Sequence, residues 1–76
     1  MEPRILKIGE EVSGKYKDMQ LGQNKKFFRV RIGNEEFYLP KDVGASLLKS
    51  HQRGYETFTI RRALDVYEIT PIAEAG

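Results

Sequence analysis

The chain has 76 residues, a formal net charge of +2 and no cysteine. Its length fits one small domain, 1–76, around a single hydrophobic core, and the lack of thiols excludes disulfides and thiolate zinc sites. The sequence holds no apolar run near the roughly 20 residues of a membrane-spanning helix, and no apolar signal-peptide region follows its first residues. We therefore expect a cytoplasmic protein without a membrane segment.

A short apolar segment and then one strand come first. Residues 5–10 are mainly apolar and end in a Gly-Glu turn. Residues 11–21 alternate between small or apolar and polar side chains, which indicates a strand. Gly14 marks a bend or bulge in that strand. A flexible polar loop over residues 21–26 follows and ends in two lysines.

The segment Lys25–Pro40 is the most informative, because it predicts a β-hairpin whose two faces differ in chemistry. Gly33-Asn34 is a two-residue turn signal between two β-rich runs. Alternation along the strands then gives one apolar face for the core and a second face of aromatic and basic residues. The predicted cross-strand pairs are Ile32–Glu35, Arg31–Glu36, Val30–Phe37, Arg29–Tyr38 and Phe28–Leu39. The second face carries Phe27, Arg29, Arg31 and Tyr38.

The second face needs a reason beyond packing, since a strand requires only one buried face. Exposed aromatic rings stack on bases, and arginines neutralise phosphates, so the pattern indicates a nucleic-acid surface. Phe27 and Tyr38 are the candidate stacking residues, and Arg29 is expected to stack on Tyr38 or on a base. Arg31 faces Glu36, so part of its charge is expected to go into a surface ion pair.

A short helix is expected after the hairpin. Asp42 is the candidate N-cap, after a proline that suits a helix start. Gly44 lowers the helix propensity, which predicts a short helix, and Gly54 is placed to end it. The apolar stripe of this helix consists of Val43, Leu47 and Leu48.

Two further strands are expected at the end of the chain, over Tyr55–Ala63 and Val66–Ile72, with a turn at residues 64–65. Opposite charges across the two strands support this register. Residues 73–76 are expected to be a disordered tail. The predicted cross-strand pairs are Ile60–Ile69 and Arg61–Glu68.

The element order is three strands, a helix and two strands, which predicts a mainly β fold. Five strands with a short helix between the third and the fourth match the layout of an OB-fold-like closed barrel, here over residues 5–72. An SH3-like barrel is the alternative, and the helix counts against it.

Three stretches carry a family resemblance. Residues 8–16 resemble the Gly-bent first strand of OB domains, and residues 55–62 and 66–72 resemble the last two strands of small phage-type single-stranded-DNA-binding proteins. The resemblance implies a viral protein that binds single-stranded DNA, or RNA, with low sequence specificity. It also implies a ligand on the face of the second and third strands, beside the loops at its two ends.

Six further cations are candidate nucleic-acid-binding residues. In the strand at residues 11–21, the two lysines are expected to project from one side, and two more lysines lie in the adjoining loop. Two arginines lie near the loop between the last two strands. Together they add positive potential around the predicted face. These residues are Lys15, Lys17, Lys25, Lys26, Arg61 and Arg62.

The sequence gives little support for an enzyme, a metal site or a cofactor. His51 is the lone histidine, and neighbouring Ser46 and Ser50 lie too close along one helix for a hydrolytic triad. Neighbouring glutamates on a strand point to opposite faces and do not form a dyad. The alternative to nucleic-acid binding is a phage-type inhibitor or adaptor that docks on a host or replication protein through the same face. The sequence does not decide between a monomer and a homodimer.

Overall fold

The computed structural model describes residues 4–22 and 25–74, and within them it contains six strands and one helix. The mainly β class is therefore confirmed, with the helix between the hairpin and the last two strands, as expected. In chain order the elements are β1 (Arg4–Ile5), β2 (Glu11–Leu21), β3 (Phe27–Ile32), β4 (Glu35–Pro40), α1 (Lys41–Gln52), β5 (Tyr55–Arg62) and β6 (Tyr67–Glu74).

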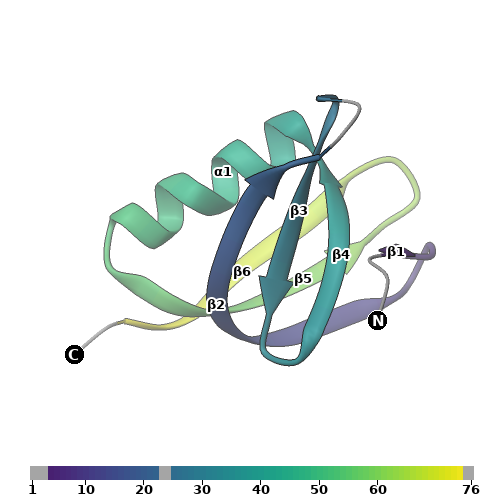
Figure 1. The fold of residues 1–76 in the computed structure, drawn as a ribbon. Helices are drawn as coiled ribbons and strands as arrows, with labels where there is room; N and C mark the ends of the chain where they lie inside the picture. The colour runs from purple at the N-terminus through teal and green to yellow at the C-terminus, as the bar shows by residue number, and fades with distance from the viewer. Residues whose placement is uncertain (1–3, 23–24, 75–76) are drawn as a thin grey trace.

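The strands form one mixed sheet in the order β1-β4-β3-β2-β5-β6 (Figure 1). β2 joins the two halves of this sheet, because residues 11–15 pair with β5 and residues 16–21 pair with β3. β2 curves strongly, so that β3 and β4 lie in front of β5 and β6 in Figure 1. β1 runs parallel to β4, whereas the other neighbouring strands are antiparallel.

The structure differs from the expected closed five-stranded barrel. Arg4–Ile5 form a sixth strand on the outer edge of β4, where a closing strand would otherwise pair. Within residues 4–22 and 25–74, no strand pairing joins β6 to β1 or β4. The sheet is therefore open between its two edge strands.

Both predicted strand registers are confirmed. In the hairpin, all five predicted pairs occur, including Arg29 opposite Tyr38 and Val30 opposite Phe37. In the last two strands, Ile60 lies opposite Ile69. The pairs Arg31–Glu36 and Arg61–Glu68 are also as predicted.

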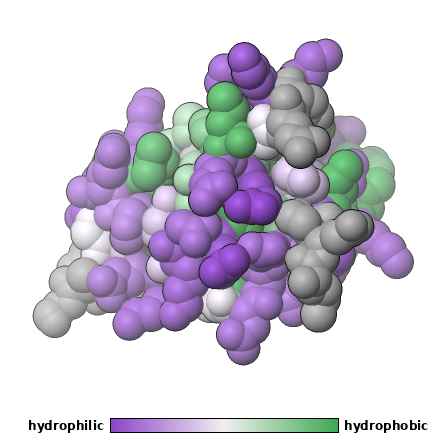
Figure 2. Space-filling model, in the orientation of Figure 1, coloured by the Kyte–Doolittle hydropathy of each residue, from purple (hydrophilic) through white to green (hydrophobic). Residues whose placement is uncertain are grey.

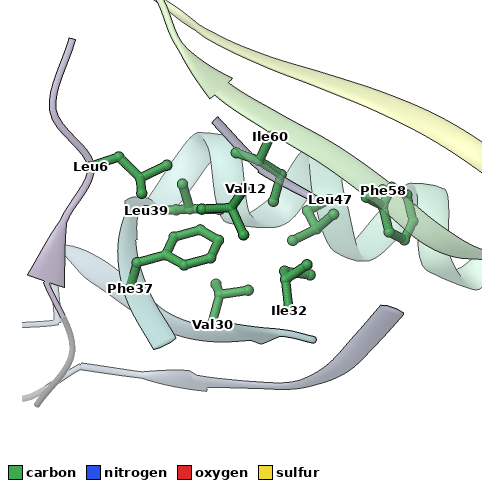
Figure 3. Packing of buried hydrophobic residues seen from close by; sticks show 9 residues of the cluster. All are labelled: Leu6, Val12, Val30, Ile32, Phe37, Leu39, Leu47, Phe58 and Ile60. Atoms are coloured by element: carbon green, nitrogen blue, oxygen red, sulfur yellow. The ribbon is translucent and has the colours of Figure 1, made fainter. Parts of the chain in front are cut away.

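The hydrophobic core lies between the two halves of the sheet and the helix. In Figure 3 the side chain of Leu47 extends from α1 toward the strands, and Phe58 and Ile60 lie opposite Val30 and Ile32. Phe28, which shares a face of β3 with Val30, is half-buried and packs against this cluster. The nine buried residues of the core are Leu6, Val12, Val30, Ile32, Phe37, Leu39, Leu47, Phe58 and Ile60.

The helix is longer than its glycine predicts, with 12 residues. Gly44 is buried against the ring of Phe28, and an added Cβ would lie only 2.4 Å from Phe28 Cδ2. Its missing side chain therefore lets the helix approach β3, and packing outweighs the low propensity of glycine. Gly54 has φ of 108° after the helix, which confirms it as the residue that ends it.

The predicted N-cap at Asp42 is wrong by two positions. Pro40 occupies the N-cap, with no side-chain capping bond, and Asp42 lies in the first turn. There its carboxylate faces the positive end of the helix dipole, which also favours the helix start.

The last strand extends beyond its predicted end at Ile72. β6 continues to Glu74 because Ala73 and Glu74 pair with Thr57 and Tyr55 at the start of β5. The tail prediction fails for these two residues, and residues 75–76 lie outside the described residues. Residues 23–24 of the predicted loop also lie outside them.

Candidate nucleic-acid interface

A β-bulge in β2 decides which of its side chains reach the predicted binding face. Tyr16 pairs with Ile32, but the next pair is Asp18 with Arg31, so Lys17 is an extra residue in the strand. A bulge of this kind interrupts the alternation of faces. As a result Met19 packs against the core, whereas the residues before and after it lie on the outer side.

Three rows of paired residues make up the outer surface of the front strands, which we term the β2–β3–β4 face. Hydrophilic residues predominate over β2 and β3 in this view (Figure 2). The first row follows from a backbone hydrogen bond of 2.8 Å from Gly22 N–H to the Phe27 carbonyl. The rows are Gly22–Phe27–Pro40, Gln20–Arg29–Tyr38 and Asp18–Arg31–Glu36.

The two candidate stacking residues lie in neighbouring rows of the face. Phe27 and Tyr38 are both half-buried, so each leaves part of its ring in contact with solvent. A Cβ built on Gly22 would lie 3.5 Å from Tyr38 Cε1. Since β3 lies between β2 and β4, the ring of Tyr38 leans across β3 toward the bare backbone of Gly22. The rings of Tyr38 and Phe27 thus share the end of the face that adjoins the loop after β2.

Arg29 is held by an amide rather than by an aromatic ring. Its Nη2 donates a hydrogen bond of 2.8 Å to Gln20 Oε1. Among residues 4–22 and 25–74, the cation–π contact is instead that of Arg62 over Tyr67, at 5.7 Å from the ring centroid. Because Gln20 is neutral, no carboxylate in its own row opposes the charge of Arg29. Glu36 in the next row is close enough for the charge of Arg29 to contribute to the lowered pKa of that carboxyl.

Arg31 is neutralised by two carboxylates. Its Nη2 lies 2.6 Å from Glu36 Oε1, and its Nη1 lies 3.9 Å from Asp18 Oδ2. The hydrogen bond from Arg31 holds the pKa of the Glu36 carboxyl below its ordinary value, and the same bond raises the pKa of Arg31. The predicted ion pair is present, and with two carboxylates against one guanidinium this third row carries a net negative charge.

The lysines near the face lie at its two ends. Lys17 lines a polar hollow of about 530 Å³ at the hairpin tip, together with Arg4, Arg31 and Glu36. At the opposite end, the N–H of Lys25 donates to the Gly22 carbonyl at 3.0 Å. Beside it, the carbonyl of Lys26 accepts a hydrogen bond of 3.2 Å from the first residue of α1.

Three predicted site residues lie elsewhere. Lys15 belongs to the half of β2 that pairs with β5, and its Nζ lies 3.9 Å from Glu56. Lys15 and Lys17 are both exposed and flank Tyr16, which packs against the core, so they project from one side of β2 as expected. Lys15 nevertheless lies beside β5 rather than beside β3.

The two arginines at the end of β5 have other partners as well. Arg61 lies between Glu11 and Glu68 in the sheet and contacts Glu68 at 3.1 Å. Arg62 donates to the Leu6 carbonyl at 2.7 Å. These two cations support the structure around the β5–β6 turn and do not reach the β2–β3–β4 face.

His51 is a packed helix-end residue. Its ring stacks on Tyr16 with centroids 4.1 Å apart, and its Nδ1 lies 3.0 Å from the Tyr55 carbonyl. Burial raises the pKa of the Tyr16 hydroxyl. Within the described part of the chain, no group of three or more acidic, histidine or cysteine residues is arranged to hold a metal ion.

Sequence reasoning missed three members of the face: Asp18, Gln20 and Gly22. Strict alternation along β2 puts Lys17 and Met19 on the outer side instead. The signal for the bulge is the adjacent polar pair Lys17-Asp18 between Tyr16 and Met19, both of which pack against the core.

No protein-family model matches the chain, and neither the curated proteins nor the solved structures include a significant match. The one helix in residues 4–22 and 25–74 is too short and too polar to cross a membrane.

Proposed function

We propose that the chain is an OB-fold-like module that binds single-stranded nucleic acid, DNA in the first instance, on its β2–β3–β4 face. The strand arrangement supports this, since β2 pairs with both β3 and β5 and the helix lies between β4 and β5. OB-folds are partly open five-stranded barrels that bind oligonucleotides on the second and third strands. Those strands correspond to β3 and β4 here, with β1 as an addition.

A single observation carries the proposal: Phe27, Arg29 and Tyr38 lie together on an outer face that packing does not require. Each base stacked on an aromatic side chain contributes about 1–3 kcal/mol, with little dependence on sequence. The charge of Arg29 is not opposed by a carboxylate within its row. The face thus combines stacking surfaces with positive charge, as single-strand binders do.

The lysines at the two ends of the face extend the path for a phosphate backbone. Lys17 and Lys25 are both exposed. If these two cations each displace one counterion, the logarithm of the binding constant falls with the logarithm of salt concentration with a slope of about −1.4. The neutralised row of Arg31 adds nothing to this slope while Glu36 is ionised.

Titration of a fluorescently labelled oligo-dT at two salt concentrations tests the proposal. Raising the salt from about 50 to about 200 mM should weaken binding about sevenfold. Absence of binding at micromolar protein and low salt would refute the proposal. Capture of a host protein that survives nuclease treatment would then favour a protein partner on the same face.

Variants locate the binding surface. Phe27→Leu keeps an apolar side chain but removes the π-face, and it should weaken binding about fivefold or more. Arg29→Ala should also weaken binding. Arg61→Ala is the matched control, because it removes the same charge from the other half of the sheet and should leave affinity nearly unchanged. Equal losses for Arg29→Ala and Arg61→Ala would place the surface elsewhere.

A further inference from the structure

The hydrogen bond between Gln20 and Arg29 fixes which polar atoms the face presents to a ligand. The amide oxygen of Gln20 accepts from Arg29 Nη2 at 2.8 Å. The amide NH₂ of Gln20 and the other N–H groups of Arg29 are all donors, because a guanidinium has no acceptor. At this position in the middle row the face therefore presents a cluster of adjacent donors.

The four bases differ in how well they match adjacent donors. Guanine carries two neighbouring acceptors, O6 and N7, and paired donors of arginine bind them bidentately. Cytosine likewise has O2 and N3 side by side on its Watson–Crick edge, which is free in a single strand. Adenine places an amino group beside N7 and N1, and thymine and uracil place N3–H between their two carbonyl groups. Adjacent donors thus fit guanine and cytosine better.

The donor cluster lies where a stacked base would direct its edge. Tyr38 is directly opposite Arg29, and such cross-strand neighbours have Cβ atoms about 4.5–5.5 Å apart. The ring of Tyr38 leans across β3 between Phe27 and Arg29. A base stacked on either aromatic ring can therefore turn one edge toward Arg29 and Gln20.

The next row limits the readable site to one base. There Arg31 donates to Glu36 at 2.6 Å and faces Asp18 as well, so two carboxylates surround its donors. Arg29 has no such acidic partner in its own row. Of the two arginines on the face, Arg29 alone can direct paired donors at a base without breaking an ion pair.

We propose that Gln20 and Arg29 form a donor-only base reader, which makes the β2–β3–β4 face prefer guanine or cytosine over adenine, thymine and uracil. This inference rests on the proposed single-strand binding and names the base preference of that same site. Gln20 orients the guanidinium through its amide oxygen and adds its NH₂ to the donor cluster, while Arg29 supplies the paired donors that contact the base.

Competition among oligonucleotides of equal length tests the reader. An oligo-dC and an alternating dT-dG oligonucleotide should compete about fivefold or more better than oligo-dA, the lower limit for one bidentate pair. Oligo-dC should also compete better than oligo-dT for binding to the protein. Equal affinities of the wild-type protein for oligo-dC and oligo-dA would overturn the inference but leave the proposed function intact. If none of the four oligonucleotides binds, the proposed function itself is overturned.

Arg29→Lys separates base reading from charge. Lysine keeps the positive charge but has no planar pair of donors. The variant should lose the preference for oligo-dC over oligo-dA and retain the salt dependence of binding. Gln20→Ala should reduce the preference with little change in affinity for oligo-dT. Arg61→Lys is the control and should alter neither quantity, whereas an unchanged preference in Arg29→Lys would refute the reader.

Discussion

Replacing Gly44 with alanine adds one methyl group at the place where α1 approaches β3. The new Cβ would lie 2.4 Å from Cδ2, 3.1 Å from Cγ and 3.2 Å from Cβ of Phe28. Three close contacts along one side chain cannot all be relieved by rotating the ring about its own axis. The helix or Phe28 must therefore move.

Two opposing effects set the size of the change in stability. Alanine in a helix interior is favoured over glycine by about 1 kcal/mol, whereas overpacking typically costs about 1–3 kcal/mol. With contacts this short we expect the second to win, for a net loss of about 1 kcal/mol in the free energy of unfolding. Urea denaturation followed by circular dichroism measures this loss.

A double-mutant cycle makes the test specific. Phe28→Val removes the ring and places a β-branched residue, which strands favour, at this position. In that background Gly44→Ala should become neutral or stabilising, because the propensity gain of about 1 kcal/mol remains and most of the overlap disappears. Ala45→Gly at the exposed neighbouring position gives the propensity effect alone. The close-packing argument is refuted if Gly44→Ala stabilises the wild-type protein, or has the same effect in both backgrounds.

Three further predictions concern ion pairs and backbone geometry. Glu36→Gln should remove the closer of the two carboxylates beside Arg31, tighten oligo-dT binding and steepen the salt slope by about 0.7; an unchanged slope would show that Arg31 does not reach the phosphates. Hydrogen bonds from arginines lower the pKa values of Glu10 and Glu36 below the ordinary value of 4.5. The ionised carboxylates therefore contribute their full stabilisation above pH 4.5, and this contribution is lost as the pH falls through the lowered pKa values. In the double variant Glu10→Gln/Glu36→Gln, the free energy of unfolding should fall less between pH 7 and pH 3 than in the wild-type protein. Urea midpoints that change equally with pH in both proteins would contradict this. Gly54→Ala forces a side chain onto φ of 108° and should destabilise by about 1–3 kcal/mol in urea denaturation, although among the described residues no atom beyond its chain neighbours lies within 4 Å of the new methyl group.

The hairpin could be predicted in detail because its signals are local. Gly33-Asn34 allows one two-residue turn, and alternation on both sides is unbroken, so the register of β3 and β4 follows from the turn. The aromatic and basic face of these strands could be predicted for the same reason.

The parts that escaped prediction depend on contacts between distant segments. The polar pair Lys17-Asp18 is a weak signal for a bulge, because it contains no glycine or proline, and the bulge is defined only when β2 pairs with β3. From the sequence, Gly44 is simply a residue of low helix propensity, and its close contact with Phe28 exists only in the folded protein. The open edge of the sheet likewise involves β1, which pairs with β4 and whose Arg4 forms ion pairs of 2.5 Å with Glu10 and 2.7 Å with Glu35, a residue of β4.

The division of β2 between two partners has a consequence for the order in which the chain folds. Its second half pairs with β3, which follows after a short loop, so Tyr16 and Ile32 meet early at small entropic cost. Its first half pairs with β5, and Val12 meets Ile60 only after most of the chain is in place. We expect the meander of β2, β3 and β4 to form before the β2–β5 ladder. The candidate binding face would then be assembled in the folding transition state, while substitutions in residues 11–15 would chiefly speed unfolding.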